Sequence, residues 1–266
     1  MSAIEARLSE VGLVGTYLHG SLASGAYFPP KSDVDLLFVV ERPLDPALRE
    51  RLSLTCVDAA AARPTLGTLE LSVLLRDATR AGVFPMGCEL HFGENMVGPV
   101  LSGTADYGPG ARDDDLPTHI RCLQETGVVI AGAPIDQVFA PVPSPVFRTS
   151  VEADQEWILE GDHILESPVY GVLNLCRGLW LDRRPAHTST PSKVEAGLWA
   201  ATQLPPDLRR VVQAALDAHR DPGWIAPDHR RTGGRVWDVG ALERFRDAFR
   251  TLLGAPDDGH PERVSE

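Results

Sequence analysis

The 266-residue sequence has little cysteine, no surplus of positive charge and no long hydrophobic run. Its four cysteines lie far apart without a C-x-x-C pair, and no zinc-binding spacing can be built with the eight histidines, which favours buried thiols in a reducing compartment. The formal net charge of -12 argues against nucleic acid as the main partner and suits a cationic small molecule. No apolar run approaches the roughly 20 residues that span a bilayer, and the N-terminus has no signal-peptide core. We therefore expect a cytoplasmic, monomeric globular protein that binds neither nucleic acid nor membranes.

The stretch from Leu18 to Val40 carries the clearest chemical pattern. A Gly20-Ser21 turn and a Gly/Pro-rich loop precede Asp33 and Asp35, which enter an apolar run. Alternate side chains of a strand point to the same face, so the two carboxylates should lie side by side. Such a pair resists ionisation unless a cation lies between them, and oxygen ligands favour a divalent cation. A divalent cation is what phosphoryl or nucleotidyl transfer requires.

Two further features belong to this pattern. Gly20 would let the backbone approach a phosphate, and the Ser21 hydroxyl could bond a phosphate oxygen before a short helix at 22–27, although a Gly-Ser pair alone also fits an ordinary turn. Residues 68–75 alternate cleanly between polar and apolar, which places Glu70 on the polar face of another strand. Glu70 joins the two aspartates if the strands are neighbours with the same face up, and is otherwise a solvent-facing charge.

The remaining periodicity predicts an α+β fold. Strands are expected at 13–19, 36–40, 68–75 and 88–92, with helices at 3–10 and 46–63, the latter capped by Asp45. The acidic run Asp113 to Asp115 ends a Gly/Asp/Pro-rich linker and is interpreted as the solvated N-cap of the next helix. Helical segments follow at 117–132, 151–165, 168–183, 191–203, 207–220 and 238–254. These segments predict a mixed-sheet domain with helices over 1–112, an all-α bundle over 113–255 and a flexible tail over 256–266.

The order Gly-Ser, eleven residues, Asp-x-Asp and then a strand glutamate resembles the nucleotidyltransferase superfamily that includes DNA polymerase β. With its helical second half, the chain resembles the aminoglycoside adenylyltransferases that modify streptomycin and spectinomycin. The clearest segments are 18–40, 68–75, 88–94 and 172–180. The resemblance implies an antibiotic-resistance enzyme that uses two Mg²⁺ ions to transfer AMP from ATP to a hydroxyl of a cationic aminoglycoside or aminocyclitol, in a site between its two domains.

The resemblance also implies roles for particular residues. Asp33, Asp35 and Glu70 would hold the magnesium ions, with Glu70 also the general base that takes the proton from the attacking hydroxyl. The nucleotide phosphates would be bound by Gly20, Ser21, Ser32, Arg177 and Lys193. The interval between the last two residues is a few residues longer here than in the family, which makes the lysine the weaker match.

Acidic and aromatic residues of the second half are the candidates for binding the drug. Trp157, Asp162 and Glu166 have the spacing of the streptomycin-modifying members, and acidic groups suit ammonium and guanidinium ligands. A surface helix with a half-buried tryptophan and scattered acids would show the same pattern. Glu89 is a further candidate pocket residue. Asn95 stands where known members have an aromatic residue, so drug specificity stays open.

Two alternatives to an antibiotic-modifying enzyme follow from the same residues. The metal site could serve another acceptor, such as a protein side chain, a tRNA end or a metabolite, although the acidic balance speaks against RNA. The fold could also belong to a nucleotide or antibiotic sensor without turnover. Three intact carboxylates argue against a sensor, because a pure binder has no need to hold them together at an electrostatic cost. The sequence does not distinguish ATP from GTP.

Overall fold

The computed structural model describes residues 2–28, 32–63, 67–109, 111–184, 189–223, 225–226 and 229–254. Its internal contacts divide the chain into two compact units, Met1–Asp154 with Arg220–Arg230, and Gln155–His219 with Arg231–Glu266. The predicted domain boundary at 112 stays a prediction, because contacts do not measure which part of the chain folds independently. The predicted tail over 256–266 lies outside the described residues.

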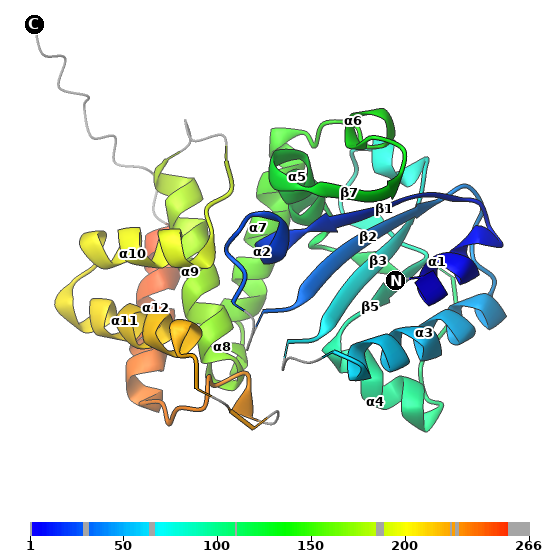
Figure 1. The fold of residues 1–266 in the computed structure, drawn as a ribbon. Helices are drawn as coiled ribbons and strands as arrows, with labels where there is room; N and C mark the ends of the chain where they lie inside the picture. The colour runs from blue at the N-terminus through cyan, green and yellow to red at the C-terminus, as the bar shows by residue number, and fades with distance from the viewer. Residues whose placement is uncertain are drawn as a thin grey trace, which may run out of the picture. The chain divides into compact units, whose positions relative to one another are not determined.

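The first unit is built on a five-stranded sheet in the order β5-β3-β2-β1-β7 (Figure 1). Its strands are β1 (Leu13–His19), β2 (Val34–Val40), β3 (Leu69–Leu75), β5 (Leu90–Phe92) and β7 (Val128–Gly132). The sheet is mixed, because β2 and β3 are parallel whereas the other neighbours are antiparallel. Parallel neighbours need a crossover, and α3 (Pro46–Ala61) supplies it, with the predicted Asp45 cap accepting a hydrogen bond from the Leu48 N–H at 2.7 Å.

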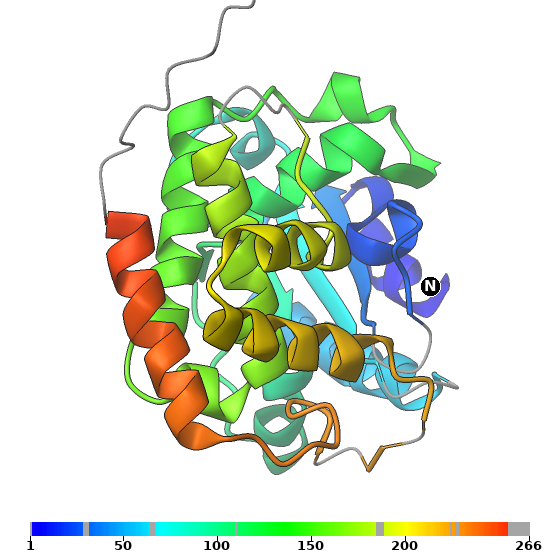
Figure 2. The ribbon, with the colours of Figure 1, turned by 90° about the vertical axis from the view of Figure 1, so that its left-hand side faces the viewer.

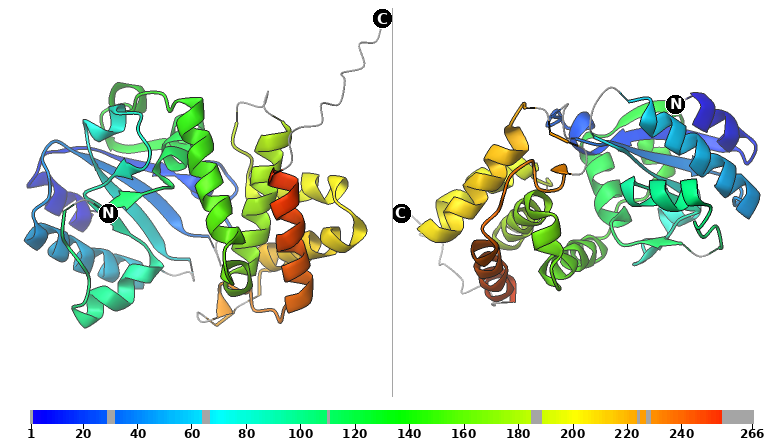
Figure 3. Two further views of the ribbon diagram at one scale, coloured as in Figure 1. Left: turned by 180° about the vertical axis from the view of Figure 1, so that it is seen from behind. Right: turned by 90° about the horizontal axis from the view of Figure 1, so that it is seen from below.

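Helices cover both faces of this sheet (Figures 1 and 3). One face packs against α1 (Ser2–Ser9), α3 and α4 (Glu94–Ser102), and the other against α5 (Leu116–Thr126) and α6 (Ile135–Val138). Strand alternation explains the division: Leu36 and Phe38 face the first layer, whereas Leu37 and Val39 face the second. By the same alternation Asp35 shares the face of Leu37, so the polar end of the sheet lies on the α5 side.

The predicted helix at 117–132 is wrong in its second half. α5 ends at Thr126, Gly127 has an extended backbone, and the next five residues form the edge strand β7. The β-branched run at 128–130 favours a strand over a helix, and a short apolar run cannot be assigned by periodicity alone. The shorter elements of this unit are η1 (Ala78–Arg80) and a two-stranded sheet of β4 (Met86–Gly87) and β6 (Arg112–Asp113).

The second unit is helical, which confirms the predicted α+β class with an all-α part. Its helices include the end of α7 (Ser144–Leu159), followed by α8 (His163–Glu166), α9 (Pro168–Arg183), α10 (Lys193–Gln203), α11 (Pro206–Arg220) and α12 (Val239–Gly254). α9 packs against α8, α10 and α12, and Figure 2 shows α12 (orange to red) along the edge of this bundle. Across the described ranges, no helix has the length and apolar character that a membrane crossing requires.

Candidate active site

Two of the three predicted carboxylates lie side by side. Asp35 of β2 is paired in register with Glu70 of the parallel neighbour β3. On its other side Asp35 is paired with His19, the last residue of β1. Paired residues of a sheet point to the same face, so these three side chains form one polar row on the α5 side. The predicted alternation of 68–75 therefore places Glu70 correctly.

The Gly20-Ser21 turn packs directly over this row. Gly20 has φ +66°, and a Cβ at this position would lie 2.0 Å from Asp35 Oδ2, so only glycine fits. The helix here is α2 (Gly20–Ala23), earlier and shorter than the predicted 22–27. Ser21 is half-buried in its first turn. Ser32 is buried, and its hydroxyl accepts a hydrogen bond from the Phe28 N–H at 3.0 Å, which helps to close the loop before β2.

Asp33 has different partners from Asp35. Its Oδ1 accepts a hydrogen bond from the Thr68 N–H at 2.6 Å and forms an ion pair with the guanidinium of Arg230. Arg230 also pairs with Glu94 at 3.1 Å, and its side chain is 14 % exposed. Sequence reasoning did not single out Arg230, because 197 positions separate it from Asp33 and no local pattern marks it.

The residues fit magnesium by donor type. Carboxylate oxygens are the ligands that Mg²⁺ prefers in proteins, and Asp35 and Glu70 supply two of them on neighbouring strands. Among the described residues, however, no group of three or more His, Cys, Asp or Glu side chains converges on one point. Within the predicted set, the carboxylate of Asp33 is paired with Arg230.

The acidic run before α5 supplies the N-cap residue Asp115, as predicted, but it is less solvated than we predicted. The Asp113 side chain is 9 % exposed, and Asp115 makes no capping hydrogen bond. Burial, reinforced by nearby carboxylates, raises the pKa of Asp115 to about 6 despite the opposing effect of His119. The physical reason for the error is the docking of α5: its apolar residues Leu116 and Ile120 are buried against the sheet and carry the preceding acids inward.

A histidine that sequence reasoning missed lies next to Glu70. His119 Nε2 is 4.0 Å from Glu70 Oε1, and its ring centroid is 4.9 Å from that of His19. Burial alone would lower the pKa of His119, but the surrounding carboxylates, Glu70 foremost, raise it above its ordinary value. Burial and the neighbouring His119 hold the pKa of His19 well below its ordinary value. Two imidazoles whose pKa values are shifted in opposite directions therefore lie beside the carboxylate row. The sequence signal for His119 is its position three residues after Leu116 and one before Ile120, the apolar residues by which α5 packs on the sheet.

A Ser-His-Asp group on the same face is structural. His91 Nδ1 lies 3.0 Å from both Ser72 Oγ and Asp113 Oδ2, and the hydroxyl is 3.2 Å from the same carboxylate oxygen. A nucleophilic triad needs the hydroxyl and the carboxylate on different ring nitrogens. Here both are on Nδ1, so the geometry excludes a serine nucleophile and ties β3, β5 and the start of α5 together.

Glu89, predicted as a pocket residue, makes structural contacts within the first unit. Its Oε2 forms an ion pair with Arg49 at 2.9 Å and accepts a hydrogen bond from the Leu44 N–H at 2.8 Å. Both charged side chains are buried, at 7 % and 13 % exposure. The carboxylate is thus held by the loop before α3 and by α3 itself. Asn95, by contrast, is exposed in the first turn of α4.

In the second unit, Arg177 is a half-buried cation with neutral partners. Its Nε donates to the Pro191 carbonyl at 3.1 Å and its Nη1 to Asn174 Oδ1 at 3.4 Å. No carboxylate of the described chain lies at ion-pair distance from this guanidinium. The Pro191 contact holds Arg177 against the residues that precede α10, whose first residue is Lys193. The fold therefore brings the two predicted phosphate-binding residues to the same junction of α9 and α10.

Trp157 stands in an aromatic cluster at this junction. It is 46 % exposed, stacks on His163 with ring centroids 4.3 Å apart, and meets Tyr170 edge-on at 6.2 Å. The Lys193 ammonium lies 4.9 Å from the centroid of the Tyr170 ring. The remaining two predicted drug-binding residues, Asp162 and Glu166, are exposed at the two ends of the short helix α8.

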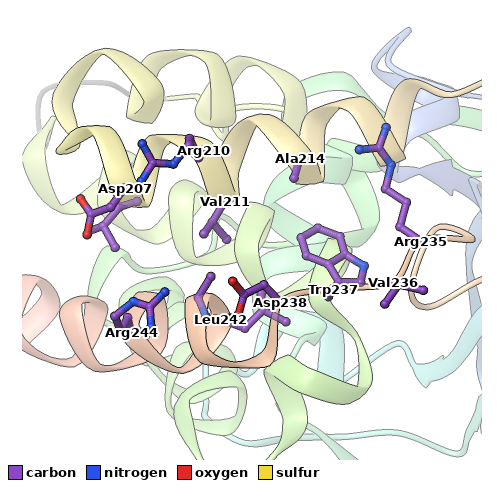
Figure 4. Close-up of a pocket in the computed structure, with 12 residues that line it drawn as sticks. Asp207, Arg210, Val211, Ala214, Arg235, Val236, Trp237, Asp238, Leu242 and Arg244 are labelled. Atoms are coloured by element: carbon purple, nitrogen blue, oxygen red, sulfur yellow. Dashed lines mark hydrogen bonds between the residues drawn. The ribbon is translucent and has the colours of Figure 1, made fainter.

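A separate pocket of about 310 Å³ lies between α11 and α12 (Figure 4). Its floor is apolar and includes Val211, Trp237 and Leu242, and three arginines reach its rim. It contains none of the predicted site residues, so the pocket and the predicted chemistry are distinct features of the molecule.

Comparison with known proteins connects these observations. Residues 137–231 match the family model of the aminoglycoside adenylyltransferase C-terminal domain. An aminoglycoside (3'') (9) adenylyltransferase of Klebsiella pneumoniae is 28 % identical over 214 residues, which cover 79 % of each chain. A relative of the same name from Rhizobium radiobacter is 28 % identical over 223 residues, covering 82 % of this chain and 80 % of its own.

The fold has a counterpart of known structure. The spectinomycin adenyltransferase AAD(9) from Enterococcus faecialis, crystallised with ATP and spectinomycin, superimposes with a TM-score of 0.76. The match covers 95 % of this chain and 99 % of that one at 18 % sequence identity, a level at which the likeness shows the fold. Together, the family model over residues 137–231 and the relatives make this chain similar to aminoglycoside adenylyltransferases, and the structural match shows that it shares the fold of one.

Proposed function

We propose that this protein transfers AMP from ATP to a hydroxyl of a cationic aminoglycoside or aminocyclitol antibiotic, with spectinomycin and streptomycin as the first substrates to test, and so gives resistance. The observation that carries the proposal is the in-register pair Asp35 and Glu70, with Gly20 in contact with the first of them. Relatives named for this activity, and a fold neighbour crystallised with ATP and spectinomycin, support the choice of substrates.

The carboxylates have separate tasks in this proposal. Asp33, Asp35 and Glu70 would hold two magnesium ions, which when bound polarise the α-phosphate and stabilise the attacking and leaving oxygens. Glu70 also takes the proton from the attacking hydroxyl, a task that suits a carboxylate at the end of the polar row. His119 Nε2 lies 4.0 Å from Glu70 Oε1 and helps to position this carboxylate.

Two basic residues of the second unit are proposed as partners of the nucleotide phosphates. Arg177 and Lys193 are assigned to the triphosphate, because charge accumulates on the pyrophosphate leaving group. Arg177 suits this role, since its guanidinium has only neutral oxygen partners within the described chain and a bidentate fork matches phosphate oxygens. Ser21 is assigned to the phosphates from the turn beside Asp35. Ser32 is the weaker candidate, because its hydroxyl already serves the Phe28 N–H.

The drug is assigned to the exposed face of Trp157. Asp162 and Glu166 lie close to it in sequence, and neither carboxylate forms an ion pair within the described chain. Ammonium and guanidinium groups of an aminoglycoside are suitable partners for such acids, and a cation also binds favourably over an indole ring.

The decisive experiment incubates purified protein with ATP, Mg²⁺ and a panel of aminoglycosides and measures pyrophosphate release. We expect release with at least one drug, and a Glu70→Gln variant that binds ATP and drug but turns over several orders of magnitude more slowly. Glu50→Gln, an exposed carboxylate of α3, is the matched control and should keep full activity. Failure of every drug to release pyrophosphate, with ATP still bound, would refute the proposed function.

A further inference from the structure

The guanidinium of Arg230 pairs with Asp33, a carboxylate that the proposed function assigns to metal binding. It belongs to the short segment Arg220–Arg230 that returns to the first unit. One nitrogen of its guanidinium pairs with Asp33, and another pairs with Glu94 of α4 at 3.1 Å. With 14 % exposure the side chain is shielded from water, whereas Asp33 keeps 27 % and Glu94 45 % of their surface. A shielded pair is screened less by solvent than an ordinary surface ion pair.

The same oxygen atom of Asp33 cannot serve both the guanidinium and a metal ion. A carboxylate oxygen that accepts from Thr68 N–H and pairs with Arg230 has little room for a third partner. The Thr68 contact holds the carboxylate in place without Arg230. The cation can therefore leave while Asp33 keeps its position. Guanidinium groups bind phosphate as well as carboxylate in the same planar, two-pronged manner.

We propose that Arg230 competes with divalent metal for Asp33 and moves to the triphosphate oxygens when metal and nucleotide enter. The inference rests on the proposed function only in taking Asp33 as a metal ligand. In the unliganded protein Arg230 pairs with both Asp33 and Glu94; in the loaded protein it adds a positive charge beside the leaving group. Empty protein therefore has a reduced affinity for free metal, because only the fraction with Arg230 displaced can bind it.

Metal binding without nucleotide or drug tests this directly. Free Mn²⁺ is titrated into wild type, Arg230→Ala, Arg230→Lys and the control Arg231→Ala, and unbound Mn²⁺ is measured by its electron paramagnetic resonance signal. We expect the Mn²⁺ dissociation constant to fall about tenfold in Arg230→Ala, the factor expected for loss of one competing charge-assisted bond. The Mn²⁺ dissociation constant of Arg230→Lys should lie between those of wild type and Arg230→Ala, and that of Arg231→Ala should equal the wild-type value. Binding of α,β-methylene-ATP at saturating Mn²⁺ should weaken in Arg230→Ala.

The direction of the change separates a specific role from damage to the fold. A damaged fold weakens metal binding, whereas the proposal requires Arg230→Ala to strengthen it. An unchanged or weakened Mn²⁺ affinity in Arg230→Ala would overturn the proposal. Glu94→Gln, which removes a second ion-pair partner of Arg230, provides a second variant and should tighten Mn²⁺ binding to a smaller extent. No tightening there, should Arg230→Ala fail to fold, overturns the proposal as well.

The proposed function fails in a different way. If wild type and Asp33→Asn bind Mn²⁺ equally, Asp33 is not a metal ligand and the metal site itself is wrong. If Mn²⁺ binds at Asp33 but no drug releases pyrophosphate, the competition of Arg230 with metal stands and the antibiotic substrate is wrong.

Discussion

Replacing Glu89 by alanine should destabilise the first unit strongly while leaving its chemistry intact. The carboxylate neutralises the buried Arg49 at 2.9 Å and accepts the Leu44 N–H at 2.8 Å. Arg49 is further fixed by the carbonyls of Tyr107 and Gly108, at 3.1 and 2.9 Å, so it cannot swing out to water without breaking these bonds. Glu89→Ala therefore leaves Arg49 as a buried cation without its carboxylate partner.

Known energies set the size of the effect. Breaking a buried ion pair from one side costs about 3–5 kcal/mol, and exposed pairs contribute about 0–1 kcal/mol. The chain offers a matched control in the exposed pair Arg51 and Glu10, which are 44 % and 49 % exposed and 3.4 Å apart. Glu10→Ala should cost less than about 1 kcal/mol. For a unit of this size, Glu89→Ala should lower the melting temperature by roughly 6–20 °C.

The assay is urea denaturation and thermal melting of both single variants, together with steady-state kinetics for the drug. The double variant Arg49→Met with Glu89→Leu should recover part of the lost stability, because it removes both charges. The reasoning would be refuted if Glu89→Ala cost less than about 1 kcal/mol and raised the KM for the drug, which is the result expected of a pocket residue.

Three further predictions follow from the site. Gly20→Ala should destabilise by about 1–2 kcal/mol from its left-handed φ alone and displace Asp35, lowering kcat in the pyrophosphate assay. Asp113→Asn should bring the pKa of His91 below 6.5, because burial then outweighs the remaining charges; nuclear magnetic resonance titration checks this. Because the pKa of His91 is raised in the folded protein, its contribution to stability is fully present below about pH 6.5. Because the pKa of Asp113 is lowered, its contribution is fully present above about pH 3.9, so the pair should stabilise the fold most between these two pH values. Arg177→Ala should weaken ATP-analogue binding by about tenfold or more, with Arg177→Lys recovering part, as measured by calorimetry.

The strand pattern predicted the carboxylate row well because a strand has a strict period of two. Residues 13–19 and 68–75 were expected as strands, and the structure has β1 at Leu13–His19 and β3 at Leu69–Leu75. Once these strands form, only one pairing register buries their apolar face, because a shift of one residue would turn every apolar side chain to the polar face. Glu70 and Asp35 therefore meet through constraints that are local in the sequence.

The α5 region was predicted less well, because its assignment depends on packing. A short apolar run such as 128–130 fits a helix or a strand, and its pairing with β1 decides between them. Asp113 and Asp115 carry ordinary features of an exposed helix start. Only the docking of α5 on the sheet buries them and creates the charged neighbourhood of His119.

Arginines are harder to place from the sequence than strand carboxylates. A carboxylate on a strand has its face fixed by alternation, but an arginine has a long side chain whose partner is set by where its segment returns. Arg177 was expected from the family resemblance, and the structure has it half-buried in the helix α9. Arg230 follows no such helix; it lies in a connecting segment, and its partner Asp33 is 197 positions away. The cation that pairs with Asp33 is thus set by a long-range contact, so a search for such a cation must begin from the fold.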